Sequence, residues 1–147
     1  MNKTTILCSE INGEGPPLLV IHGFTGDRST MSSITEPLSE DYSVVCVDLP
    51  GHGETGSNLE PSLFSFEETL SALLEVTDFY GLEEFNLVGY SMGARLSIGL
   101  AAMYPDRIKS TILIGATAGI SDESERAARR RSDDRLADEI LEKGIEW

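Results

Sequence analysis

The sequence predicts a single α/β domain, or part of one, built on a mostly parallel sheet with helices on both faces. Short continuous apolar runs such as LLVI, SVVCV and FNLV are typical of parallel strands that are buried on both faces. Amphipathic stretches separate these runs, so strands and helices alternate along the chain. At 147 residues and 40% hydrophobic, the chain is long enough for one core and too short for two ordinary domains.

Five segments have the composition of strands. The apolar runs among them end at glycine, proline or aspartate, which interrupt strands. Because crossovers between parallel strands are right-handed, the connecting helices are expected on both faces of the sheet. The expected strands are residues 4–10, 18–23, 43–48, 85–90 and 108–117.

Apolar side chains at helical spacing predict three connecting helices. The clearest begins at Ser65, where Ser65 and Glu68 have the spacing of a capping box, and it ends at Gly81. The other two helices are expected over residues 30–39 and 91–104.

The last segment, SDESERAARRRSDDRLADEILEKG, is strongly charged along its whole length. Asp122 and Glu125 have the spacing of a helix cap, so we interpret the segment as a helix that leaves the sheet. The predicted organisation is a core part over residues 1–120 and a separate helical part over residues 121–147.

The charge of the chain argues against a nucleic-acid partner. Its formal net charge is −14 and no broad cationic face is evident from the sequence, so phosphates have little to bind. The sign reverses locally where five arginines lie between positions 126 and 135. A basic patch on an acidic protein suits a small anionic ligand, although charge runs usually form a solvated face.

Nothing in the sequence predicts a membrane span, a metal site or a cofactor. No apolar run approaches the roughly 20 residues that cross a bilayer. The N-terminus lacks the apolar stretch and cleavage site of a signal peptide. Cys8 and Cys46 do not have metal-ligand spacing and are expected to stay reduced. We therefore expect a cytoplasmic protein that uses no metal and no cofactor.

The stretch GYSMG, residues 89–93, joins the expected strand FNLV to an expected helix. A serine between two glycines at such a junction is typical of a nucleophile elbow, whose tight turn exposes the serine in a strained conformation. The backbone N–H of Met92 would lie at a helix N-terminus, where peptide dipoles favour negative charge. Ser91 is thus the candidate catalytic nucleophile, and Met92 is a candidate oxyanion-hole donor.

A second oxyanion-hole donor is expected in HGFTG, which follows the strand LLVI. The backbone N–H of Phe24 would face that of Met92, and Gly23 would let the two backbones approach closely. The alternative is that HGFTG is only a turn, which its two glycines would also explain.

Together, LLVIHGFTGD, VVCVDLPGHGET, NLVGYSMGARL, YPDRIKSTILIGATAGI and ESERAARRRSDDRLADEI resemble the α/β-hydrolase fold over nearly all of the chain. More narrowly, GYSMG-x-R followed by ER-x-x-R resembles the MenH family, the 2-succinyl-6-hydroxy-2,4-cyclohexadiene-1-carboxylate synthases of menaquinone biosynthesis. The resemblance implies a lyase that eliminates pyruvate from 2-succinyl-5-enolpyruvyl-6-hydroxy-3-cyclohexene-1-carboxylate. It further implies proton abstraction through a Ser-His-Asp triad, and a helical lid that begins at residue 121.

The resemblance also implies three substrate-binding residues. Arg95 matches the arginine of the SMG-x-R motif and lies one turn after Ser91, where it could hold a carboxylate bidentately. Arg126 matches the lid arginine, and Tyr90 matches the aromatic residue before the serine. Arg95 and Arg126 could instead be solvated surface residues, and Tyr90 a packing residue.

The acid and the base of the triad are not evident in the sequence. In an α/β-hydrolase chain both follow the serine, but no histidine follows His52. His52 precedes Ser91, so we interpret it as a structural loop residue, and His22 as part of the oxyanion loop. The sequence therefore predicts an N-terminal fragment, truncated at the start of the lid and inactive by itself.

Two other functions are compatible with the sequence. HGFTG and GYSMG are shared by many α/β hydrolases, so an ester or thioester hydrolase is the first alternative. The missing base motivates the second, a non-enzymatic binding chain or an inactive fragment. Ala94 stands where the MenH pattern more often has a second glycine, a change that a helix tolerates.

Overall fold

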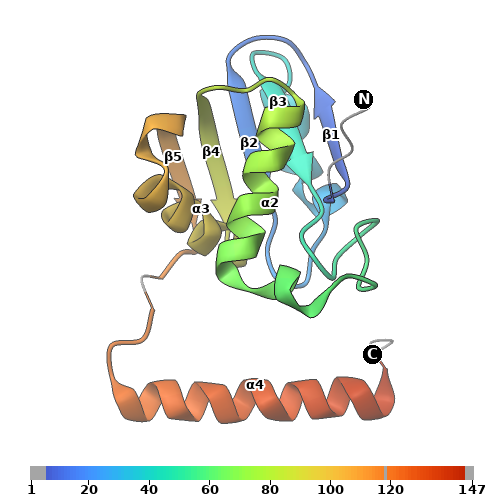
Figure 1. Ribbon diagram of the computed structural model, residues 1–147, viewed down its shortest axis with the longest axis vertical. Helices are drawn as coiled ribbons and strands as arrows, with labels where there is room; N and C mark the ends of the chain where they lie inside the picture. The colour runs from blue at the N-terminus through green and yellow to red at the C-terminus, as the bar shows by residue number, and fades with distance from the viewer. Residues whose placement is uncertain (1–5, 118, 145–147) are drawn as a thin grey trace. The chain divides into compact units, whose positions relative to one another are not determined.

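The computed structural model describes residues 6–117 and 119–144, in two compact units that divide after Ala116 (Figure 1). The first unit holds a sheet covered by helices, and the second holds one long helix. The α/β architecture predicted from the alternating apolar runs is confirmed. The sequence predicts a domain boundary at residue 120, and the assignment of the two parts as functional domains stays a prediction.

The described residues of the first unit form a five-stranded sheet with the order β1-β3-β2-β4-β5. β1 runs antiparallel to β3, and the other neighbouring strands are parallel. The carboxyl ends of the parallel strands therefore meet at one edge, where ligand sites form in open α/β sheets. The strands are β1 (Ser9–Asn12), β2 (Pro17–Ile21), β3 (Ser43–Val47), β4 (Phe85–Tyr90) and β5 (Ile108–Ile114).

Helices connect the parallel strands. Ser65 caps α2 by accepting a hydrogen bond from the Glu68 backbone N–H at 3.3 Å, as the Ser-x-x-Glu pattern predicts. The helices of this unit are α1 (Ser32–Leu38), α2 (Phe66–Phe79) and α3 (Met92–Met103), with short 3₁₀ turns η1 (Arg28–Met31), η2 (Pro61–Phe64) and η3 (Pro105–Arg107).

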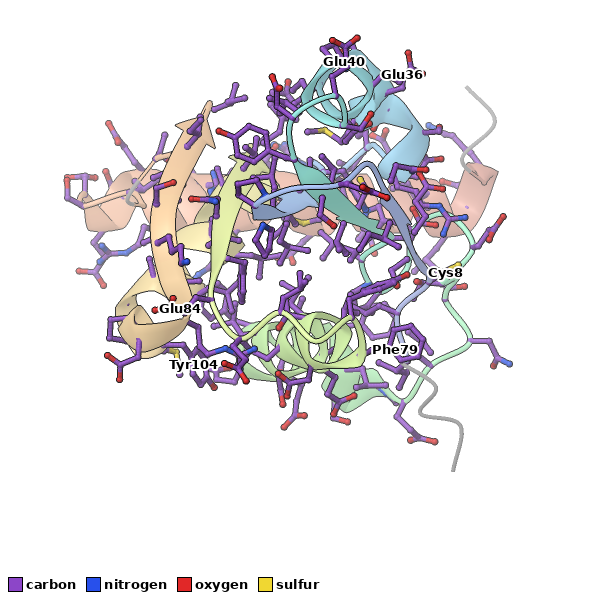
Figure 2. All side chains as sticks on the ribbon, turned by 90° about the horizontal axis from the view of Figure 1, so that it is seen from above. Cys8, Glu36, Glu40, Phe79, Glu84 and Tyr104 are labelled. Atoms are coloured by element: carbon purple, nitrogen blue, oxygen red, sulfur yellow. The ribbon has the colours of Figure 1, made fainter. Side chains whose placement is uncertain are left out.

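The central strands are buried on both faces because their side chains alternate between two apolar clusters. Odd-numbered residues of β2, such as Leu19 and Ile21, pack with α2 and α3. Even-numbered residues, such as Leu18 and Val20, pack on the side of Met31 and α1. Figure 2 shows the sheet between these two layers, with Glu36 on the α1 side and Phe79 on the α2 side. The two clusters fix the register of the sheet that positions the site.

The largest departure from the predicted strands is at the N-terminus. Residues 4–10 are expected to form a strand, but β1 covers Ser9–Asn12, and residues 4 and 5 lie outside the described part of the chain. β1 is a short edge strand whose side chains are exposed or half-buried, so it has no apolar signature. β5 also ends earlier than predicted, at Ile114.

The second unit consists of α4 (Glu123–Lys143), which begins and ends as predicted. The Asp122 side chain accepts a hydrogen bond from the Glu125 backbone N–H at 2.9 Å, and Gly144 stands at the C-cap with φ 78°. No described side chain of α4 is buried. The helix is therefore stabilised by its caps and by pairs such as Arg129–Asp133, at 2.7 Å, rather than by an apolar core of its own.

Candidate active site

Ser91 occupies a strained turn between β4 and α3. Its φ is 51° and its ψ is −104°, and it is the only described residue other than glycine with a positive φ. Such a conformation costs about 1–3 kcal/mol and persists where surrounding contacts enforce it. The Ser91 N–H donates to the Ile114 carbonyl at 2.8 Å, which anchors the turn to the end of β5. The serine thus stands at the carboxyl edge of the sheet.

The glycines on either side of Ser91 are required by close backbone approach. A Cβ on Gly93 would overlap the carbonyls of Ile21 and His22, because α3 begins directly against the end of β2. The Gly93 N–H donates to the His22 carbonyl at 3.1 Å. A Cβ on Gly89 would lie 2.6 Å from the Gly93 carbonyl oxygen. This packing holds the serine turn against the loop that follows β2.

The loop HGFTG lies beside the serine. A Cβ on Gly23 would be 2.8 Å from Cδ1 of Tyr90 and 3.5 Å from Cβ of Ser91, so a side chain at this position would displace the Tyr90 ring. The structure therefore brings the backbone that precedes Phe24 against Ser91. HGFTG and GYSMG thus lie side by side, as the glycines in the two motifs predict.

Two histidines flank this loop. His22 is fully buried; its Nδ1 lies 2.7 Å from the Gly23 carbonyl oxygen, and its Nε2 accepts a hydrogen bond from the Leu49 N–H at 3.0 Å. Nε2 of His52 contacts the Phe24 carbonyl oxygen at 2.5 Å, and its Nδ1 lies 2.9 Å from the Pro50 carbonyl oxygen. The carbonyl oxygen of Gly23 thus contacts His22, and that of Phe24 contacts His52.

Burial of the imidazole lowers the pKa of His22. The nearby His52 lowers it further, whereas the Gly23 carbonyl and the carboxylates Asp48 and Asp27 act in the opposite direction. Burial has the largest effect, so His22 stays neutral at physiological pH. A neutral ring has one N–H and one acceptor nitrogen, which matches a carbonyl on one side and an N–H on the other.

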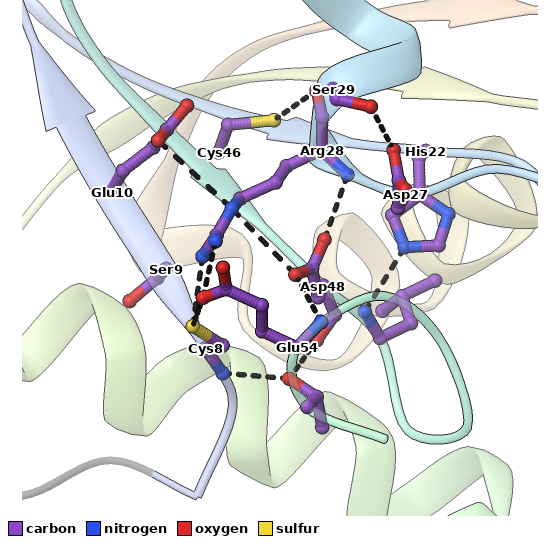
Figure 3. A network of polar contacts seen from close by, with 12 residues as sticks. Cys8, Ser9, Glu10, His22, Asp27, Arg28, Ser29, Cys46, Asp48 and Glu54 are labelled. Carbon is purple, nitrogen blue, oxygen red and sulfur yellow. Dashed lines mark hydrogen bonds and ion pairs between the residues drawn. The ribbon is translucent and has the colours of Figure 1, made fainter. Parts of the chain in front are cut away.

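A polar network centred on Arg28 ties the loop after β2 to the loop after β3 (Figure 3). The buried Asp48 carboxylate accepts hydrogen bonds from the backbone N–H groups of Arg28, at 2.8 Å, and Glu54, at 2.9 Å. The Arg28 guanidinium in turn pairs with Glu54 at 2.7 Å and donates to Cys8 Sγ at 2.8 Å. Sequence reasoning missed this network; an aspartate at the end of the apolar run SVVCVD was its one signal.

An apolar cavity of about 330 Å³ lies beside the loop and the start of α3. The candidate oxyanion residues Phe24 and Met92 both line it, so it belongs to the same region as Ser91. Its other lining residues are Leu49, Pro50, His52, Phe64, Phe66, Thr69 and Leu96. A larger hollow of about 460 Å³, beside Asp78 and Arg107, lies near the beginning of β4, away from the carboxyl edge.

Two of the predicted substrate-binding residues also belong to this part of the structure. Tyr90 ends β4 with its side chain 48% exposed, and its ring lies against Gly23. Arg95 is exposed on the first turn of α3, one turn after Ser91, as its sequence position predicts. Both stand near the serine along the chain, and their binding roles stay predictions.

The third predicted substrate-binding residue, Arg126, belongs to the second unit. There its Nη1 donates to the carbonyls of Ile120 and Ser121, each at 2.9 Å. These bonds hold the guanidinium against the segment that precedes α4. Its role toward a substrate also stays a prediction.

The described residues contain no cluster of three or more His, Cys, Asp or Glu side chains that could hold a metal ion. Cys46 is buried, and burial raises the pKa of its thiol to about 12. None of the described helices has the length and apolar character to cross a bilayer.

Comparison with known proteins relates the chain to one family. The family model of the alpha/beta hydrolase fold matches residues 16–144. A 2-succinyl-6-hydroxy-2,4-cyclohexadiene-1-carboxylate synthase of Citrobacter koseri is 35% identical over 135 residues, which are 90% of this chain and 52% of that protein. The chain spans about half the length of the curated synthases of this name that it matches.

Solved structures agree with this relationship. MenH from S. aureus matches with a TM-score of 0.84 and 31% identity, over 94% of this chain and 53% of that one. A thermophilic esterase from Thermogutta terrifontis matches with a TM-score of 0.79 and 30% identity, over 95% of this chain and 50% of that one. MenH and this esterase thus share this half of the fold.

Replacing Gly93 with alanine tests the contact between α3 and β2. Because the added methyl overlaps backbone atoms, we expect Gly93→Ala to lower the free energy of unfolding by about 3 kcal/mol or more. Gly81→Ala is the contrasting control: Gly81, unlike Gly93, has a positive φ, at 72°, and nothing lies within 4 Å of an added Cβ. Its expected cost is about 1–2 kcal/mol from backbone strain alone. Equal urea midpoints for the two variants would contradict the overlap.

The buried His22 predicts an acid-sensitive stability. Its pKa is lowered in the folded state, so unfolding takes up a proton and stability falls as pH drops below about 6.5, the unfolded value. The lowered pKa values of Asp27, Glu54 and Asp122 act in a more acidic range, below about pH 4.5. Urea unfolding at pH 7.5 and 5.5 should show a loss in the wild type that shrinks in His22→Asn; equal losses would refute the assignment.

Proposed function

Because the chain belongs to the α/β-hydrolase fold family, we propose that it forms the N-terminal half of a 2-succinyl-6-hydroxy-2,4-cyclohexadiene-1-carboxylate synthase. The proposed enzyme is a cytoplasmic lyase of menaquinone biosynthesis. The observation that carries the proposal is the strained Ser91 turn packed against HGFTG, in a chain whose relatives include that synthase.

In the proposed reaction, Ser91 Oγ removes a proton from the ring of 2-succinyl-5-enolpyruvyl-6-hydroxy-3-cyclohexene-1-carboxylate. The electrons of that C–H bond form a new ring double bond, the existing ring double bond shifts by one position, and the C–O bond to the enolpyruvyl group breaks. The group leaves as the enolate of pyruvate, which takes up a proton on carbon to give pyruvate. Ser91 is the nucleophile-elbow serine, here used as a base. To act as a base, Ser91 would first pass its hydroxyl proton to a histidine that is oriented by an aspartate. We propose that both lie in the remaining half of the protein, since the relatives are about twice as long.

The negative charge that develops on a substrate carbonyl needs fixed donors. We assign this oxyanion hole to the backbone N–H groups of Phe24 and Met92, from the loop after β2 and the first turn of α3. The support is the contact of the two segments at Gly23 and Gly93 and the position of Met92 at a helix N-terminus. Losing one such donor typically costs about 10²–10³ in rate.

The substrate is a small anion with several carboxylates. Arg95 and Arg126 are the proposed cations that bind them, and Tyr90 is a further contact at the mouth of the site. We assign the hydrocarbon part of the substrate to the apolar cavity that Phe24 and Met92 line. We propose that α4 begins the lid that brings Arg126 to the substrate.

One observation favours a second candidate, an ester hydrolase. The cavity that Phe24 and Met92 line is apolar and suits an acyl chain, and an esterase shares the fold of this half. The same serine and the same donors would then stabilise a tetrahedral intermediate. The two candidates differ in the charge of the substrate.

The first test is pyruvate release by the complete gene product, followed with lactate dehydrogenase and NADH. We expect turnover of the enolpyruvyl substrate and a loss of about 10³-fold or more in kcat for Ser91→Ala, because the proton acceptor is removed. Ester turnover without pyruvate release would refute the lyase and support the hydrolase.

A second test separates the candidates by charge. Arg95→Ala should raise KM for the anionic substrate by about 10-fold or more, the equivalent of one lost charged hydrogen bond. Lys109→Ala also removes a cation, from an ion pair with Glu84 at the start of β5, and should change KM less than about 2-fold. Equal effects of the two variants on KM would contradict a carboxylate-binding role for Arg95.

A further inference from the structure

We infer that His22 is a positioning residue of the oxyanion hole, holding the peptide group whose N–H belongs to Phe24. This inference rests on the proposed function for its catalytic consequence, but the contacts that carry it are present whatever the reaction. His22 cannot be the triad base, because both of its ring nitrogens are occupied by backbone groups.

The tautomer of His22 follows from its two partners. The Leu49 N–H is a donor, so the Nε2 that it meets at 3.0 Å must be the unprotonated nitrogen. The proton of the neutral ring is then on Nδ1, which donates to the Gly23 carbonyl at 2.7 Å. Leu49 directly follows Asp48, which the Arg28 network fixes. The Leu49 N–H in the loop after β3 thus places the proton of His22 on Nδ1, where it can bind the Gly23 carbonyl in the loop after β2.

The Gly23 carbonyl shares one planar peptide group with the Phe24 N–H. This peptide bond is trans, so the carbonyl and the N–H point in opposite directions. The carbonyl oxygen accepts two hydrogen bonds, from His22 Nδ1 and from the Gly26 N–H at 3.1 Å. Fixing the carbonyl from two sides fixes the direction of the N–H, and it also polarises the group toward stronger donation.

The next carbonyl completes the clamp. Phe24 O contacts Nε2 of His52, so the peptide groups before and after Phe24 are each held by an imidazole. The two rings lie 5.0 Å apart. Phe24 itself is 57% exposed, so burial of its own side chain does not fix its backbone. His22 and His52 hold the Phe24 backbone instead.

Two substitutions at His22 separate its two hydrogen bonds. Asparagine has its amide nitrogen at the place of Nδ1, so His22→Asn keeps the donor to Gly23 and loses the acceptor for Leu49. Glutamine reaches the place of Nε2, so His22→Gln keeps the acceptor and loses the donor. Both variants remove the imidazole and leave a polar amide in a buried site, so general destabilisation affects them alike.

In the complete gene product, His22→Gln should lower kcat about 10-fold or more, a large part of the value of one oxyanion donor, with KM changed less than about 3-fold. His22→Asn should restore most of that loss. Equal kcat values for the two variants, or a loss in KM alone, would overturn the positioning role.

A spectroscopic readout on the complete gene product does not depend on activity. Nitrogen-15 NMR of the wild type should show His22 protonated at Nδ1 and unprotonated at Nε2. The Phe24 amide resonance should move in His22→Gln and stay close to the wild type in His22→Asn. A proton on Nε2, or an unmoved Phe24 resonance, would overturn the inference. Absence of pyruvate release with these NMR results intact would refute the proposed function alone.

Discussion

The candidate site depends on one close contact, where the first turn of α3 meets the end of β2. The Gly93 N–H donates to the His22 carbonyl at 3.1 Å, and the gap leaves no room for a side chain on Gly93. This contact holds the positive φ of Ser91, which an isolated peptide would relax. It also fixes the start of the HGFTG loop. The conformations of the serine turn and of the HGFTG loop therefore depend on each other, because each is held by its contact with the other.

Much of the fold follows from local patterns in the sequence. The buried strands β2, β3 and β4 are continuous apolar runs, and the caps of α2 and α4 are visible as Ser65 and Asp122. The bounds of β1 did not follow, because an exposed edge strand is held by its hydrogen bonds to β3 rather than by apolar side chains. Pairing between distant strands leaves no mark on the composition of a strand that is not buried.

The same distinction applies to the site. Glycine spacing in GYSMG and HGFTG predicts that Ser91 and the loop meet, since a glycine is needed wherever two backbones touch. The roles of His22, Asp48 and Leu49 could not be read in this way. The bonds that join the two loops link residues 20 or 27 positions apart, and one partner in each is a backbone N–H, which nearly every residue carries. Only the folded arrangement of the two loops shows which of these groups meet.

The division of the chain into two units has an evolutionary consequence. Each described hydrogen bond that shapes Ser91, Phe24 and the two histidines is made within the first unit. Within this chain, the described side chains of α4 include none that is buried. If α4 is the start of a lid, as proposed above, its sequence can change in evolution while these contacts around Ser91 are kept. MenH from S. aureus and the Thermogutta terrifontis esterase, which share this half of the fold under different names, agree with such divergence.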